Sequence, residues 1–148
     1  MLFREFAQTC DAIEQISSRL TMTDLLAGIF PQLSERELPI FVRFMRGRVF
    51  PDWSAEKLGF GPGLLYEAVA YVIGKKREYV VSAINSSGDS GKVVEELLAK
   101  REQMVFFSED LELTDVYSRF LSMAKSSGRK SQQERMRTAQ YLLSNASP

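Results

Sequence analysis

The segment of residues 126–137 combines a glycine-containing turn, a helix-start signal and four cations. Ser131 and Glu134 have the S-x-x-E spacing of a capping box, which predicts a helix that begins just after Ser131. The first turn of a helix has backbone N–H groups without internal partners and a partial positive charge, and Arg129 and Lys130 lie directly before it. The arrangement suits a phosphate group, although an ordinary solvated helix end carries the same residue types.

Composition excludes several kinds of chemistry. The chain has 148 residues, one cysteine and no histidine. Histidine-dependent nucleophilic catalysis and imidazole metal sites are therefore excluded, and no EF-hand spacing of acids is present. The single cysteine, Cys10, rules out an internal disulfide and fits a reducing compartment; it falls on an apolar stripe, so we expect it to be buried and inert. The sequence contains no apolar run long enough to span a membrane.

Charge is unevenly distributed along a chain whose net charge is zero. From Tyr117 onward there are six cations and one acid, a net charge of +5, and the preceding residues carry a net charge of −5. A basic end on an acidic body indicates one surface that faces a polyanion.

Apolar residues recur at helical spacing through most of the chain, and no stretch alternates convincingly as a strand. We therefore predict an all-α fold, an irregular bundle of about eight short helices, forming a single domain over residues 1–148. A second capping box is expected at Ser34 and Glu37, Pro31 and Gly88 are expected to end helices, and Thr114 could cap another. The first two helices are expected around residues 3–13 and 23–30, and the apolar positions that mark the others run over residues 38–45, 65–72, 79–84, 93–98, 116–124 and 136–143.

Two glycine-containing motifs resemble nucleotide loops without meeting their requirements. Gly59-Phe60-Gly61-Pro62-Gly63 lacks the preceding strand of a dinucleotide-binding fingerprint, and a tight entry into a helix explains it better. Gly88-Asp89-Ser90-Gly91-Lys92-Val93 is too short for a P-loop, and Val93 stands where a metal-binding hydroxyl is required. Glycines in the first motif still permit the backbone to approach an external phosphate closely.

An aromatic pair lies in a charged stretch predicted to be a loop, in Gln103-Met104-Val105-Phe106-Phe107. Both rings could pack into the core beneath the loop. Alternatively, Phe106 and Phe107 could fill a hydrophobic pocket of a partner, with Gln103 as a polar anchor.

The order of these features resembles the N-terminal DNA-binding domain of ATP-dependent DNA ligases, especially the archaeal replicative type. The stretches that carry the resemblance run the whole length of the chain, and their order is more specific than any one of them. They are Met1-Leu2-Phe3-Arg4-Glu5-Phe6, Ser17-Ser18-Arg19-Leu20, Gly47-Arg48-Val49-Phe50-Pro51-Asp52-Trp53, Leu58-Gly59-Phe60-Gly61, Gly88-Asp89-Ser90-Gly91 and Gly128-x-x-Ser131-Gln132-x-x-Arg135.

The resemblance implies a helical domain that clasps duplex DNA around a nick through backbone and minor-groove contacts. It implies that Gly59 and Gly61 lie near the backbone of the opposite strand. In the last stretch Arg135 stands where the family usually has lysine, which alters the expected phosphate geometry. The residues that the resemblance places at the phosphates are Gly128, Arg129, Lys130, Ser131, Gln132 and Arg135.

The resemblance also suggests a protein partner. Some archaeal ligases carry a Q-x-x-F-F motif in this domain that binds the sliding clamp (PCNA), and Gln103, Phe106 and Phe107 fit that motif.

Catalysis is expected to belong to residues outside this chain. The family's catalytic lysine lies in a K-x-D-G motif, which the sequence lacks. We therefore expect a fragment of a ligase that is inactive alone and binds no cofactor, with ATP and magnesium belonging to the parent enzyme.

The sequence thus predicts sequence-independent binding of nicked duplex DNA, in DNA replication, repair and recombination, by an intracellular (cytoplasmic), DNA-associated monomer with no membrane contact. The alternative is a helical protein-interaction module without nucleic-acid binding, favoured by the zero net charge and the phenylalanine pair.

Overall fold

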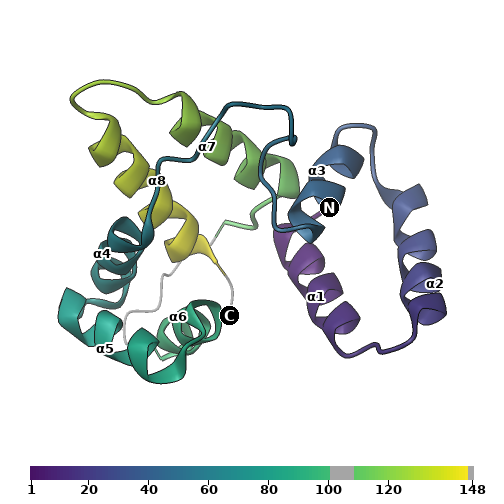
Figure 1. Cartoon of the computed structure of the whole chain (residues 1–148), viewed down its shortest axis with the longest axis horizontal. Helices are drawn as coiled ribbons and strands as arrows, with labels where there is room; N and C mark the ends of the chain where they lie inside the picture. Colours follow the sequence, from purple (N-terminus) through teal and green to yellow (C-terminus); the bar gives the residue numbers. More distant parts are fainter. Residues whose placement is uncertain (101–108, 147–148) are drawn as a thin grey trace. The chain divides into compact units, whose positions relative to one another are not determined.

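The computed structural model describes residues 1–100 and 109–146 of the chain, and within them it is all α (Figure 1). The all-α prediction is confirmed. The described residues contain eight α-helices and one 3₁₀ helix, η1, with no strand beyond an isolated antiparallel bridge between Leu2 and Glu112. The elements are α1 Phe3–Glu14, α2 Arg19–Ile29, η1 Phe30–Gln32, α3 Glu37–Met45, α4 Pro62–Ile73, α5 Arg77–Ser87, α6 Ser90–Ala99, α7 Leu113–Lys125 and α8 Ser131–Asn145.

The chain divides into two compact units, and the boundary between them falls inside α7. Unit 1 comprises Met1–Lys57 and Asp110–Leu121, and unit 2 comprises Leu58–Glu109 and Ser122–Pro148. Each unit has its own apolar cluster. The single domain predicted over residues 1–148 therefore contains two separately packed parts.

The core of unit 1 is aromatic. Phe41 and Leu113 are fully buried, and the Phe6 ring meets the Phe41 ring edge-on with centroids 5.4 Å apart. Such edge-to-face pairs stabilise a core by about 0.5–1.5 kcal/mol beyond the area they bury. Cys10 lies at the margin of this cluster and is half-buried rather than buried; burial raises the pKa of its thiol, so it is a poor nucleophile.

Helix α2 begins earlier than predicted. It begins at Arg19, four residues before the predicted start, because the Ser18 hydroxyl accepts a hydrogen bond from the Thr21 N–H at 3.4 Å. At the other end α2 stops at Ile29, just before Pro31 as predicted, and Pro31 lies at the start of η1, where a missing N–H loses no hydrogen bond. The prediction that Thr114 caps α7 is wrong. The helix begins at Leu113, one residue earlier, and the Thr114 hydroxyl donates to the Glu112 carboxylate.

The capping box predicted ahead of α3 is confirmed. The Glu37 carboxylate accepts from the Ser34 N–H at 2.8 Å and from its hydroxyl at 2.7 Å, while the Ser34 hydroxyl accepts from the Glu37 N–H at 3.3 Å. The other carboxylate oxygen is paired with the Met1 ammonium. The ammonium and Ser34 lower the pKa of the Glu37 carboxyl from 4.5 to about 2, and the same pairing raises the pKa of the ammonium above 8.0.

This ion pair predicts a pH window of stability. The lowered pKa of Glu37 means that its contribution is complete above pH 4.5 and is lost as pH falls through about 2. The raised pKa of the ammonium means that its contribution is complete below pH 8.0 and is lost as pH rises further. Glu37→Gln, which keeps the capping geometry, should therefore lower the melting temperature by a few degrees between those limits and very little near pH 2.

Melting curves between pH 2 and 8, followed by circular dichroism, test this expectation. Asp110→Asn is the matched control, because it removes the exposed ion pair with Arg4 and should change stability only slightly at any pH. A melting temperature for Glu37→Gln that equals the wild-type value at neutral pH would contradict a stabilising ion pair between Glu37 and the Met1 ammonium.

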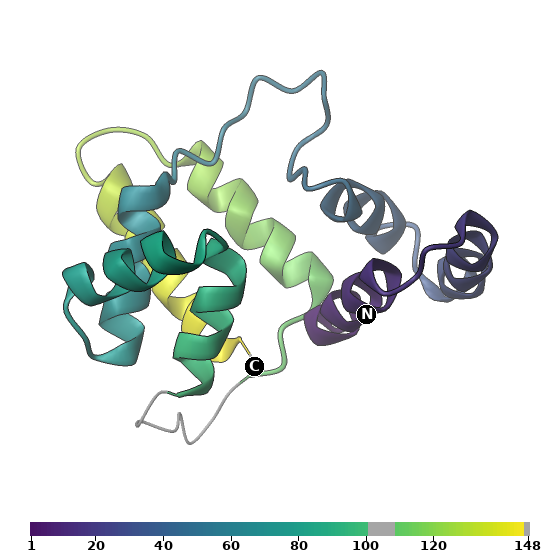
Figure 2. The same ribbon diagram turned by 60° about the horizontal axis from the view of Figure 1, so that its bottom comes forward.

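Unit 2 is built on α4. Val69 of α4 and Val80 of α5 are fully buried, Val93 of α6 joins them, and Leu143 of α8 packs against the cluster. Both views show α4 and α8 side by side (Figures 1 and 2). The packing brings the start of α8 and the loop ahead of α4 into one compact unit.

Glycines end two helices of unit 2. Gly74 ends α4 in the left-handed region (φ 65°), with the Lys75 N–H donating to the Ala70 carbonyl at 3.0 Å. Gly88 ends α5 in the same way, and the Asp89 carboxylate then caps α6 by accepting from the Lys92 N–H at 3.1 Å. The Gly88–Gly91 stretch thus connects α5 to α6 and is not a P-loop.

Candidate nucleic-acid interface

The start of α8 lies where the sequence predicts it, but the predicted capping box is wrong. Ser131 is the first helical residue and no side chain caps the helix. Glu134 does not reach back to Ser131, because its carboxylate accepts a hydrogen bond from the Ser126 hydroxyl, on the other side of the turn. Gly128 makes that turn possible with φ 84°, and its carbonyl accepts from the Ser131 N–H at 3.2 Å.

Two cations directly before α8 are available to a ligand. Arg129 and Lys130 are exposed, as are Gly128 and Gln132. Within residues 1–100 and 109–146, no hydrogen bond or ion pair engages the side chain of Arg129 or Lys130. Free N–H groups of a first helical turn and two unpaired cations form a positive, donor-rich surface. This surface can accept phosphate oxygens without reading bases.

Arg135 is positioned differently from these two cations. Its side chain is half-buried, and its guanidinium group donates from Nε to the Met123 carbonyl at 3.1 Å and from Nη2 to the Ser126 carbonyl at 2.8 Å. Nη1 lies 3.5 Å from the Ser131 hydroxyl. The first two acceptors belong to the last turn of α7 and the residue after it, where carbonyls lack helical partners. Arg135 therefore joins the end of α7 to the start of α8.

The same guanidinium lies against Gly59. A Cβ atom added to Gly59 would lie 2.7 Å from the Arg135 Cζ atom, closer than real Cβ contacts, and Gly59 has φ 61°. The left-handed backbone favours glycine there, and a Cβ atom would displace the guanidinium from its present position. The structure thus brings together two predicted phosphate-contacting elements that are far apart in sequence.

Gly61 lies next to this contact, at the start of α4. It has extended backbone (φ −93°, ψ 175°) and precedes Pro62, the first residue of the helix. Proline suits this position because the first helical N–H has no partner to lose. Gly61 is exposed and its added Cβ would meet nothing within 4 Å. No neighbouring residue therefore requires a glycine at position 61, and a ligand could approach this backbone because the surface is open.

The predicted clamp-binding residues, Gln103, Phe106 and Phe107, lie outside the described residues. Among those that the structure describes, no group of acids and cysteine has the arrangement of a metal site. No helix in the described part of the chain is long and apolar enough to cross a membrane.

The sequence analysis did not predict that Arg135 bonds the end of α7 to α8, or that the Ser126 hydroxyl donates to the Glu134 carboxylate. A signal for the latter was present, because Ser126 and Glu134 flank a glycine turn and can meet across it. The contact between Gly59 and Arg135 had no local signal, since neither residue forms a spacing pattern with the other.

The fold and the exposed basic helix start do not by themselves define a family, and comparison with known proteins is more specific. The family model described as DNA ligase N terminus matches residues 2–148. The chain belongs to this family. It is 72% identical over its full length to the DNA ligase of Methanocorpusculum labreanum and 54% identical to that of Methanoculleus marisnigri. In both cases the match covers 27% of the relative, so the chain spans about a quarter of their length.

Proposed function

We propose that this chain is the DNA-binding part of an ATP-dependent DNA ligase and holds nicked duplex DNA through its phosphate backbone. The observation that carries the proposal is the exposed, unpaired cations Arg129 and Lys130 ahead of the first turn of α8. Membership of the DNA ligase N terminus family supports duplex DNA as the ligand and a DNA ligase as the parent enzyme.

The proposed mechanism is binding and not chemistry. Arg129, Lys130 and the N–H groups at the start of α8 would hold phosphates of one strand, and the Gly59–Gly61 loop would approach the opposite strand. Arg135 bonds the end of α7 to α8 and lies against Gly59, and its remaining N–H groups could donate to a phosphate as well. Contacts to phosphates are independent of sequence, so affinity should be the same for unrelated duplexes.

The remaining parts of the proposal rest on the family resemblance. ATP, magnesium and the covalent step would belong to the parent enzyme, which would act in replication, repair and recombination inside the cell. Docking on a sliding clamp through Gln103, Phe106 and Phe107, and a monomeric state, stay predictions.

Removing the two free cations should weaken DNA binding. The double variant Arg129→Ala/Lys130→Ala should bind any duplex ~10-fold or more weakly at low salt, because two phosphate contacts are lost. The measurement is fluorescence anisotropy with two unrelated labelled duplexes, each with and without a nick.

The matched control for this test is Lys75→Ala/Lys76→Ala, which also removes two adjacent exposed cations from unit 2. It causes the same change in net charge and should weaken binding much less. Equal losses in the two double variants would indicate a general electrostatic effect. An absence of duplex binding by the folded wild type would favour the alternative, a protein-interaction module.

A further inference from the structure

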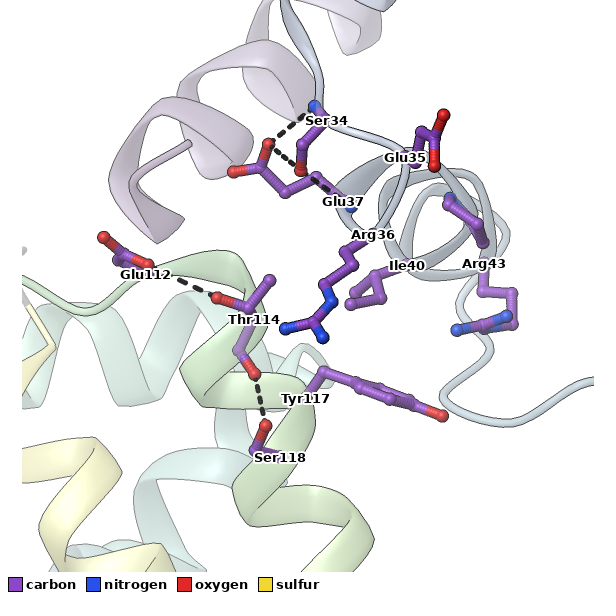
Figure 3. A pocket seen from close by; sticks show the side chains of 11 residues that line it. Ser34, Glu35, Arg36, Glu37, Ile40, Arg43, Glu112, Thr114, Tyr117 and Ser118 are labelled. Atoms are coloured by element: carbon purple, nitrogen blue, oxygen red, sulfur yellow. Dashed lines mark hydrogen bonds between the residues drawn. The ribbon is translucent and has the colours of Figure 1, made fainter.

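Unit 1 contains a cavity that the proposed DNA contacts at α8 do not use. It has a volume of about 530 Å³ and lies beside the start of α3 and the first turns of α7 (Figure 3). Its lining combines two guanidinium groups with hydroxyl groups. The lining residues that carry the argument are Arg36, Arg43, Thr114, Tyr117 and Ser118.

The two arginines both line the cavity on the Tyr117 side. The Arg43 Cζ atom lies 5.2 Å from the centroid of the Tyr117 ring, which is a cation–π contact. Figure 3 shows the Arg36 guanidinium pointing toward Thr114 and Tyr117. Within the described ranges, no hydrogen bond or ion pair holds the Arg36 guanidinium. One guanidinium in the cavity, that of Arg43, contacts the Tyr117 ring, and the other, that of Arg36, has no hydrogen-bond or ion-pair partner among the described residues.

The carboxylates that line the cavity are directed elsewhere. Glu37 is paired with the Met1 ammonium and bonded to Ser34. Glu112 accepts from the Thr114 hydroxyl at 3.4 Å, and in Figure 3 the Glu35 carboxylate points away from Tyr117. None of the three is paired with Arg36 or Arg43 in the part of the chain that the structure describes.

The Nε atom of Arg43 is buried and has no hydrogen-bond partner among the described residues. A buried donor on a charged group is costly to leave unpaired, and a small movement of the side chain that let an acceptor reach it would remove that cost. Arginine has donors only, and its planar fork fits two oxygens of one tetrahedral anion. We propose that this cavity binds the phosphate group of a phosphate ester, held by Arg36 and Arg43 over Tyr117.

The size of the cavity favours an ester over the free ion. Ligand sites of about 300–1,000 Å³ hold whole small molecules, and 530 Å³ leaves space beside one phosphate group. The ester could be a small phosphate monoester or a backbone phosphodiester of duplex DNA. Only the second source depends on the function proposed above.

Arginine side-chain NMR tests the site directly, because the Nε–H signals report on each guanidinium. The probes are glycerol 3-phosphate, inorganic phosphate and a short duplex, each compared with sodium chloride at equal ionic strength. Glycerol 3-phosphate should shift the Arg43 Nε–H signal saturably. Arg36→Gln should weaken that binding about tenfold, since one charge-assisted contact pair is lost. Arg46→Gln, which removes an exposed arginine outside the cavity, should change it by less than about twofold.

The outcomes separate the possibilities. A duplex that shifts the Arg43 signal and displaces glycerol 3-phosphate identifies the DNA backbone as the source. A duplex that leaves the Arg43 signal unchanged identifies a small ester, whether or not DNA binds at α8. The proposal is overturned if no phosphate compound gives a saturable shift, or if Arg36→Gln and Arg46→Gln weaken binding equally.

Discussion

Gly59→Ala should lower the free energy of unfolding by about 2–4 kcal/mol. A non-glycine residue in the left-handed region costs about 1–2 kcal/mol. The new Cβ would also lie 2.7 Å from the Arg135 Cζ atom, so the guanidinium must move away from the carbonyls of Met123 and Ser126. Chemical denaturation followed by circular dichroism measures the change.

Gly74→Ala separates strain from collision. Gly74 also has a left-handed backbone (φ 65°), but its added Cβ would meet nothing within 4 Å, so only the conformational cost of about 1–2 kcal/mol applies. In an Arg135→Ala background, Gly59→Ala should then cost no more than Gly74→Ala, because the colliding group is absent. A double-mutant cycle with no coupling between positions 59 and 135 would contradict the contact.

Arg135→Met should destabilise the chain by about 3 kcal/mol. Hydrogen bonds that involve a charged group contribute about 1.5–3 kcal/mol each, and the substitution leaves the carbonyls of Met123 and Ser126 without their donor. Arg135→Lys should recover less than half of the loss, because an ammonium is a point donor and cannot span both acceptors. Denaturant unfolding of the three proteins gives the comparison.

Arg137→Ala is the control for this series, since Arg137 is an exposed arginine on the same helix and should change stability by no more than about 0.5 kcal/mol. Duplex affinity of Arg135→Lys, measured where the variant is folded, tests the separate prediction that Arg135 contacts a phosphate. If Arg135→Met changed the free energy of unfolding no more than Arg137→Ala does, the proposed stabilising role of the Arg135 hydrogen bonds would be contradicted.

Local sequence patterns predicted the helices well. Apolar spacing located all eight α-helices, because one face of each must be buried whatever it packs against. Ends with a strong local cause were also predicted, as at Gly88, where the left-handed residue is a glycine, and at Ser34, where the serine and Glu37 cap each other.

Predictions went wrong where a nearby group competed with the local pattern. Ser131 and Glu134 have capping-box spacing, but the Ser126 hydroxyl takes the Glu134 carboxylate across the turn. The site depends further on contacts that no local spacing encodes. Gly59 meets Arg135, and Arg43 lies over Tyr117, only because distant helices pack together. The residue types at the site were therefore predictable, whereas the division between free and engaged cations was not.

The salt dependence of duplex affinity tests the central proposal most directly. About four to six phosphate contacts predict a slope of log K against log salt of roughly −3.6 to −5.4 for the wild type. Arg129→Ala/Lys130→Ala should give a slope shallower by about 2, because two contacts are removed. A wild-type slope near zero, or equal slopes for the two proteins, would contradict phosphate binding at the start of α8.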